Sequence, residues 1–311
     1  MRPYAVALAF CLCAMFPPVA AAETVADESS VVAAMRGRAS VLLDEAGSLG
    51  REGYSKAELM VYEMIVDKFG DSADIATQAM VLRARINAAA LRLAGGDREA
   101  SEIALASIVE KFRDNPEEAI REQVAMARVR LAEMLEQSRP AAAIGHLFAV
   151  MRPGSGEAGP ALRETTALAV AAYCRLTSRH PELPRDPGLA DELLARLRND
   201  VHPGVMAGTA RALLCQAAAH AEAGRGDDAV VLCNEIESRY GTLPGEAFAP
   251  TVAGALLLKG VELLKSGDRS GAARAFAHTV SRYGESPHTE CIVIADEARR
   301  RLRHIDPKCC P

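Results

Sequence analysis

The sequence has no tryptophan, and aromatic residues make up only 4% of its 311 positions. Few rings are therefore available to stack on sugars or nucleobases, which disfavours recognition of carbohydrates and nucleic acids. The formal net charge is −5 at pH 7, and a negative chain is a poor partner for a phosphate backbone. We therefore expect a protein that does not bind nucleic acid.

Motifs for catalysis and for cofactor binding are missing as well. The chain contains no nucleophile elbow, no His-Glu-x-x-His pair and no phosphate-binding loop. Its seven histidines are scattered along the sequence. We predict a protein that is not an enzyme and carries no cofactor.

The N-terminus carries the pattern of a targeting segment. Arg2 precedes an apolar run, Tyr4–Phe16, which is followed by Pro17-Pro18 and by small residues up to Ala22. This order predicts a cleavable signal peptide over residues 1–22. The run is too short for a membrane span, which takes about 20 residues. We therefore expect a periplasmic or secreted protein with no transmembrane segment in its mature chain.

An eleven-residue pattern recurs along the chain at a fixed interval. The ring residues Phe69 and Phe112 are 43 positions apart, and so are Tyr240 and Tyr283. A period between about 20 and 50 residues is typical of arrays of helical hairpins, which carry function on an extended surface. The four copies lie at 62–72, 105–115, 233–243 and 276–286.

Between these copies the pattern is helical, with turn residues at regular places. We predict an all-α fold: an α-solenoid of about six antiparallel helical hairpins over residues 23–304, with a C-terminal capping helix. The array is irregular around 152–203, and residues 305–311 form a cysteine-containing tail. The predicted helices are 26–49 and 55–69, 73–94 and 98–112, 116–137 and 139–151, 157–179 and 188–199, 206–223 and 227–240, 247–266 and 269–283, and the cap 287–304.

One hairpin carries a family pattern, LLLKGVELLKSGDRSGAARAFAHTVSRYG at 256–284. Gly260 and Leu263 stand at the small and large packing positions of its first helix, and Gly267-Asp268 forms the turn. Ala272 and Phe276 stand at the small and ring positions of the second helix, and GGDREA at 95–100 repeats the turn. In these residues the chain resembles tetratricopeptide repeat proteins of the long-repeat kind found in bacterial cell envelopes.

The resemblance covers about 26–304 and is strongest at 50–137 and 224–286. The usual period in that family is about 34 residues. A 43-residue repeat must therefore house about nine more, most simply in a longer first helix. Cys233 stands where a ring residue is expected. A HEAT or armadillo array, with repeats of about 40–47 residues, is the alternative. Both are α-solenoids.

Two helical stripes predict core positions. The first consists of Ile103, Leu105, Ile108, Val109 and Phe112, and the second of Val231, Leu232, Ile236 and Tyr240. The repeat explains both stripes without any cofactor.

Six cysteines remain after removal of the signal peptide, and an even number in an exported chain favours disulfides. Cys215 and Cys233 are expected at the same height on neighbouring helices, where a bridge would contribute about 3 kcal/mol. Alternatively, these two and Cys174 are buried free thiols. Cys309 and Cys310, in the tail, are candidates to bridge to Cys291, to a partner or to a second copy.

A metal site is not expected. His288, Cys291, His304 and Cys309 can be drawn together, but their spacing matches no standard zinc pattern.

Arginines gather on the first helices of the second and third hairpins. The family resemblance implies that first helices line a concave groove, so a basic stripe there would bind an acidic or C-terminal peptide. The candidate groove residues are Arg83, Asn87, Arg128 and Arg130. The alternative is a solvated charged face.

Taken with the resemblance, these features favour a non-catalytic exported scaffold that binds a protein or peptide along its concave groove in a cell-envelope complex. Two alternatives stay open. One is a redox or metal-handling envelope protein that acts through Cys309 and Cys310. The other is a helical accessory subunit of an envelope enzyme.

Overall fold

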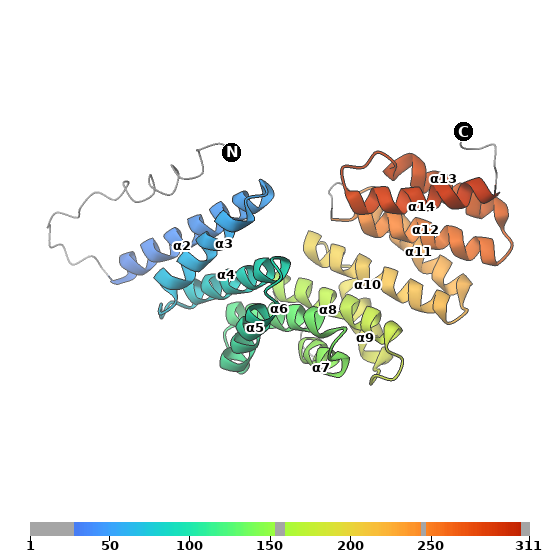
Figure 1. Cartoon of the computed structure of the whole chain (residues 1–311). Helices are drawn as coiled ribbons and strands as arrows, with labels where there is room; N and C mark the ends of the chain where they lie inside the picture. The colour runs from blue at the N-terminus through green and yellow to red at the C-terminus, as the bar shows by residue number, and fades with distance from the viewer. Residues whose placement is uncertain (1–27, 153–158, 244–246, 306–311) are drawn as a thin grey trace.

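The computed structural model describes residues 28–152, 159–243 and 247–305 (Figure 1). This part of the chain forms thirteen α-helices and contains no strand, which confirms the predicted all-α class. The predicted signal peptide and the cysteines of the tail lie outside the described residues. The helices are α2 Glu28–Arg51, α3 Ser55–Phe69, α4 Ile75–Ala94, α5 Arg98–Phe112, α6 Glu118–Leu135, α7 Pro140–Val150, α8 Pro160–Arg179, α9 Pro187–Leu197, α10 Pro203–Glu222, α11 Gly226–Tyr240, α12 Ala249–Lys265, α13 Arg269–Tyr283 and α14 Thr289–Ile305.

The predicted helix boundaries agree with these bounds to within three residues, because the turns are specified locally. Gly96 and Gly267 take positive φ values of 91° and 92°, which favour glycine. In each turn the next residue caps the following helix: Asp97 accepts a hydrogen bond from the backbone of Ala100, and Asp268 from that of Gly271. A Gly-Asp pair thus ends one helix and starts the next.

The helices form two layers along an arc. Each helix packs on the next one in the chain, and each even-numbered helix from α2 to α14 also packs on the next even-numbered helix. The odd-numbered helices pack on their even-numbered neighbours and make no comparable direct packing with one another among the described helices. In the middle of the arc, α4, α6, α8 and α10 lie on its inner side, and α5, α7 and α9 lie on its outer side (Figure 1).

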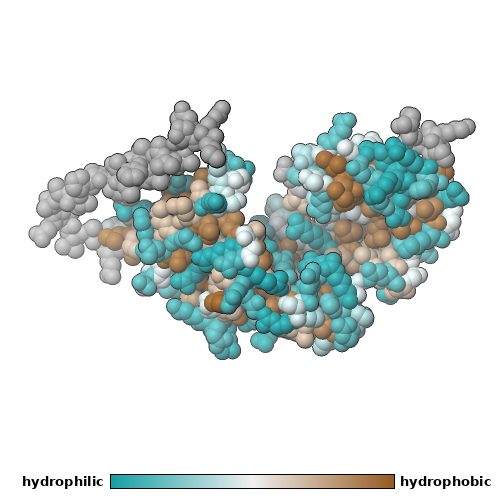
Figure 2. All heavy atoms as spheres, viewed as in Figure 1, coloured by the Kyte–Doolittle hydropathy of each residue, from teal (hydrophilic) through white to brown (hydrophobic). Residues whose placement is uncertain are grey.

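The arc is open between its N-terminal and C-terminal arms, as the space-filling view in Figure 2 shows. Hydrophilic residues cover much of the surface on this side, with separate hydrophobic areas on both arms. No helix in the described ranges is both long enough and apolar enough to cross a bilayer.

Small residues set the spacing between helices. A Cβ on Gly208 of α10 would lie 2.7 Å from the Cβ of Ala167 on α8, and one on Gly260 of α12 would lie 2.5 Å from Cε1 of Phe276 on α13. Ala272 is fully buried in the same cluster as Phe276. Gly260 and Phe276, the small and ring residues of the segment 256–284, therefore lie in contact.

The core prediction was wrong at two positions. Ile103 and Val231 are 62% and 64% exposed, whereas Leu105, Ile108 and Ile236 are buried. Ile103 stands two positions before the buried Leu105, and Val231 stands two positions before the buried Cys233. Two positions correspond to about 200° of helix rotation, so each side chain points to the opposite face.

The recurring Ser-Arg-Tyr-Gly sequence has a structural role in both of its copies. Tyr240 and Tyr283 are buried. The arginines before them reach back to the end of the preceding odd-numbered helix: Arg239 donates to the carbonyl oxygen of Arg198 at 2.8 Å, and Arg282 donates to that of Gly241. These carbonyls stand at helix ends, where they have no partner within their own helix. Each arginine thus ties the end of one outer helix to the next.

Glycine substitutions test the packing. Gly208→Ala should lower the free energy of unfolding by about 1–3 kcal/mol, because the added methyl group overlaps Ala167. Gly145→Ala, in the interior of α7 where a Cβ meets nothing within 4 Å, should raise it by about 0.5–1 kcal/mol. Urea denaturation of the two variants checks both signs. A stabilised Gly208→Ala variant would contradict the close approach of α8 and α10.

Asp74 links the first two even-numbered helices. It caps α4 by accepting from the backbone N–H of Thr77 at 2.9 Å, and it pairs with Arg36 on α2 at 2.6 Å. The hydrogen bond from Arg36 and then those from Thr77 lower the pKa of the Asp74 carboxyl from 3.8 to about 2.

This pKa predicts an acid-sensitive contribution to stability. Because the folded-state pKa lies below the unfolded-state value, the contribution is present above pH 3.8 and is lost as the pH falls through about 2. The stability difference between the unmodified protein and Asp74→Asn should therefore be largest above pH 4 and should shrink towards pH 2. Chemical denaturation across that range measures it. Asp71→Asn, at an exposed position, is the control and should show no such trend.

Candidate functional site

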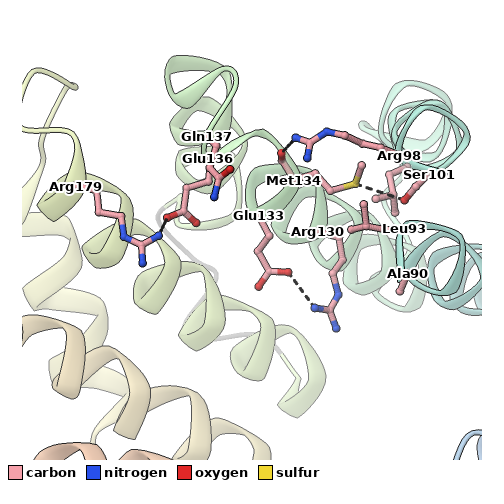
Figure 3. A pocket seen from close by; sticks show the side chains of 11 residues that line it. Ala90, Leu93, Arg98, Ser101, Arg130, Glu133, Met134, Glu136, Gln137 and Arg179 are labelled. Carbon is pink, nitrogen blue, oxygen red and sulfur yellow. Dashed lines mark hydrogen bonds and ion pairs between the residues drawn. The ribbon is translucent and has the colours of Figure 1, made fainter. Parts of the chain in front are cut away.

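A notch opens where the C-terminal ends of α4, α6 and α8 meet the start of α5 (Figure 3). Its cavity has a volume of about 290 Å³. The lining combines apolar side chains of α4 with arginines and carboxylates from the other three helices. The polar and sulfur-containing residues of the lining are Arg98, Ser101, Arg130, Glu133, Met134, Glu136, Gln137 and Arg179.

Glu136 is the buried charge of this notch. Its carboxylate accepts from Arg175 at 3.1 Å and from Arg179 at 2.6 Å, both on α8. These two arginines are one helical turn apart, so they can hold the two oxygens from the same face of α8. Figure 3 shows Arg179 reaching Glu136 across the gap between α8 and α6. A buried carboxylate is tolerated only with such partners.

The opposite wall is held by hydrogen bonds to uncharged acceptors. Arg98, at the start of α5, donates to the carbonyl oxygen of Met134 on α6. Ser101 is buried and donates to the carbonyl oxygen of Ala89 at 2.8 Å, and its hydroxyl lies 3.5 Å from the sulfur of Met134. These bonds tie α4, α5 and α6 together around the notch.

The rim keeps hydrogen-bonding capacity for a partner. Arg130 is exposed and pairs with Glu133 through one contact of 3.0 Å, which leaves further guanidinium N–H groups available. Gln137 is also exposed. The notch is smaller than most ligand pockets, which measure about 300–1,000 Å³. Its chemistry therefore suits one side chain or a carboxylate of a larger partner.

The predicted groove residues do not form one site. Asn87 on α4 donates to the hydroxyl of Tyr62 on α3 at 3.1 Å, and Arg83, one turn earlier, is exposed and acts electrostatically on the same hydroxyl. These two residues lie together. Arg130 lines the notch, whereas Arg128 lies near His146 on the outer helix α7. Two positions correspond to about 200° of rotation, so Arg128 and Arg130 lie on different sides of α6.

The cysteines within the described residues are free thiols, and Cys215 and Cys233 are not joined. Burial raises the pKa of Cys174 and of Cys233 to about 12, and it also raises the pKa of Cys215 and of Cys291. A buried thiol with a raised pKa is a poor nucleophile near neutral pH. Cys309 and Cys310 lie outside the described residues.

No group of three or more His, Cys, Asp or Glu side chains is placed to hold a metal ion in the described ranges. Of the four residues considered for a metal site in the sequence, Cys309 lies outside the described ranges.

Sequence reasoning missed the contact between Glu136 and the arginines of α8. Glu136 and Arg179 are 43 positions apart, which equals the spacing of the ring residues. Aligning charged residues by the repeat period would therefore have paired them.

Comparison with known proteins adds no relative: no family model matches the sequence, and neither does any curated protein. A proposal of function therefore depends on the geometry of the chain itself.

Neutralising Glu136 tests the notch. Glu136→Gln should lower the free energy of unfolding by about 1–2 kcal/mol, because two arginines lose a charged acceptor that is shielded from solvent. The value is modest because Arg179 is itself exposed. Glu133→Gln, the same change on the same helix at an exposed pair, should alter it by less than about 0.5 kcal/mol. Equal effects in thermal or urea unfolding would contradict a buried Glu136.

Proposed function

We propose that this chain is a non-catalytic interaction scaffold of the tetratricopeptide-like kind, which binds a protein or peptide partner along the inner face of its even-numbered helices. The observation that carries the proposal is the layering: each even-numbered helix packs on the next, so their inner faces make one continuous surface. Such an extended surface suits a partner larger than a small molecule.

The connection lengths support an α-solenoid of antiparallel hairpins. α4 has 20 residues and is therefore about 30 Å long. Three residues, Gly95 to Asp97, separate it from α5, and three residues span at most about 11 Å. The chain therefore cannot return to the start of α4, and α5, which packs on α4, must run back along it. Three-residue connections also precede α3, α11 and α13.

The notch is the proposed anchor point on this surface. Arg130 stands at its rim with unused N–H donors, and a planar guanidinium binds carboxylates through two parallel hydrogen bonds. We therefore expect an acidic side chain or a C-terminal carboxylate of the partner at this position. Glu133 and the Glu136 cluster would disfavour a second carboxylate close by, which adds selectivity.

The proposed location is the periplasm or the cell exterior, as the signal-like pattern over residues 1–22 indicates. A scaffold there would organise a cell-envelope complex.

Capture of the partner tests the proposal. The tagged full-length chain, expressed in its native cells, is crosslinked and its co-purifying proteins are identified and quantified. We expect one dominant partner at a defined stoichiometry, and Arg130→Glu should reduce its recovery about tenfold or more, because a carboxylate then faces the partner's carboxylate.

Arg274→Glu makes the same charge reversal at an exposed position of the outer helix α13 and is the control. It should leave recovery unchanged. Equal recovery with Arg130→Glu and with the control would remove the notch from the proposal, and the absence of any partner would contradict the scaffold itself.

A further inference from the structure

A groove lies between the odd-numbered helices α9 and α11. Both helices pack on α10 and make no comparable direct packing with each other, so α10 forms the floor of this α9–α11 groove. Its cavity has a volume of about 460 Å³. The walls carry Asp191, Leu194 and Ala195 on α9, and Asp228, Val231 and Leu232 on α11. Each wall therefore combines aliphatic side chains with one carboxylate.

The two carboxylates stand over neighbouring turns of α10. Asp191 accepts a hydrogen bond from the side chain of Gln216 at 2.8 Å, and a carboxylate oxygen of Asp228 lies 3.7 Å from Nδ1 of His220. Gln216 and His220 are four positions apart, so they lie on one face of α10, about 6 Å apart along its axis. One carboxylate from each wall is therefore brought towards the same part of the floor.

Both carboxylates keep acceptor capacity. A carboxylate offers about four lone-pair sites, of which Asp191 uses one for Gln216. The 3.7 Å between Asp228 and His220 exceeds hydrogen-bond distance. Among the described residues of the lining, Arg198 is the one arginine or lysine, and Glu235 pairs with it at 3.2 Å. The groove therefore carries negative charge that no cation of its own lining offsets.

The same groove recurs 128 positions earlier, between α3 and α5 over α4, with a volume of about 470 Å³. The residues of this α3–α5 groove that stand 128 positions before residues lining the α9–α11 groove are Glu63, Val66, Asp67, Ala88, Arg92 and Ala104.

The two grooves differ in how the carboxylate on the wall is matched. In the α3–α5 groove the floor supplies a cation, because Arg92 pairs with Glu63 at 2.8 Å. The counterpart of Arg92 in the α9–α11 groove is His220, and that of Glu63 is Asp191, which is bound only to a neutral amide. The chain thus supplies a guanidinium group in one groove and none at the equivalent place in the other.

The aliphatic part of the α9–α11 groove is open to solvent. Val231 is 64% exposed, and Leu232 beside it is partly buried. Lysine and arginine join an apolar stem to a cationic head, so such a side chain can cover these residues while its head reaches the carboxylates. Within the described ranges, His, Cys, Asp and Glu side chains form no group of three that could hold a metal ion. An organic cation therefore fits this groove better than a metal ion.

We propose that the α9–α11 groove is a docking site for a cationic side chain, lysine or arginine, of a second protein. Asp191 and Asp228 bind the cationic head, as Glu63 binds Arg92 in the α3–α5 groove. Val231 and Leu232 contact the apolar stem. The notch is proposed to take a carboxylate and is lined by other helices, so this site does not depend on the function proposed for the inner face.

Titration with short peptides tests the site. The methyl groups of leucine and valine are isotope-labelled in the full chain, and acetyl-Leu-Lys-Leu-amide is added. The methyl signals of Val231 and Leu232 should shift saturably, with a Kd on the order of 1 mM, because one partly exposed cation and a small apolar contact give weak binding. Acetyl-Leu-Glu-Leu-amide, which reverses the charge, should give no saturable shift.

Two double variants separate the groove from the general charge of the protein. Asp191→Asn with Asp228→Asn should raise the Kd about fivefold or more, and both positions are exposed, so folding is not at risk. Glu192→Gln with Asp227→Asn is the matched control. These neighbouring residues are also exposed, do not line the groove, and change the net charge by the same amount. The control should keep the Kd of the unmodified chain.

Acetyl-Leu-Arg-Leu-amide extends the test to arginine, and binding of either basic peptide that depends on Asp191 and Asp228 supports the proposal. The proposal is overturned if neither basic peptide shifts the signals of Val231 and Leu232, if the glutamate peptide binds equally well, or if the two double variants behave alike. A shift of the same signals with protein concentration alone would assign the groove to a second copy of the chain and would also overturn it.

Discussion

Among the described residues, the buried and partly buried apolar side chains form clusters that each span three or more helices, and the rest of the structure depends on that sharing. One cluster of buried side chains runs from Ala125 on α6 to Ala212 on α10, and another from Ala207 on α10 to Ala295 on α14. Helices α6 to α10 therefore share one core, and helices α10 to α14 share another. Small residues such as Gly208 matter because they let the even-numbered helices approach closely enough to share that core.

Polar contacts also join residues that are about one repeat apart in the sequence. Arg36 reaches Asp74, Arg239 reaches the end of α9, and Arg179 reaches Glu136, each across about one repeat of sequence. Ala and Leu side chains can pack in many ways, so the apolar core alone does not fix the rotation of each helix about its axis. Directed bonds at fixed spacing add the missing specificity. The notch is one such junction, and some hydrogen-bond donors at its rim are not used by the contacts between the helices.

Helix boundaries and the all-α class could be predicted from sequence because turn chemistry is local: Gly-Asp pairs and prolines mark where several of the helices begin. The direction in which a side chain points was harder to predict from the sequence. Ile103 was assigned to the core because it is apolar and near the stripe, yet a displacement of two positions turned it outward. Arg128 and Arg130 were grouped because both stand on the same helix, yet they lie on different sides of α6. The rotation of a helix about its axis is set by its neighbours, which a short pattern does not contain.

The layering also bears on how the chain acquires its structure. Among the described helices, the main packing contacts join helices that are adjacent or next but one in sequence, so the mean sequence separation of these contacts is small relative to the length. Low contact order is associated with fast folding, and an array of this kind can grow from any folded pair. Helices that emerge from a ribosome can thus settle on those before them, without waiting for the C-terminus.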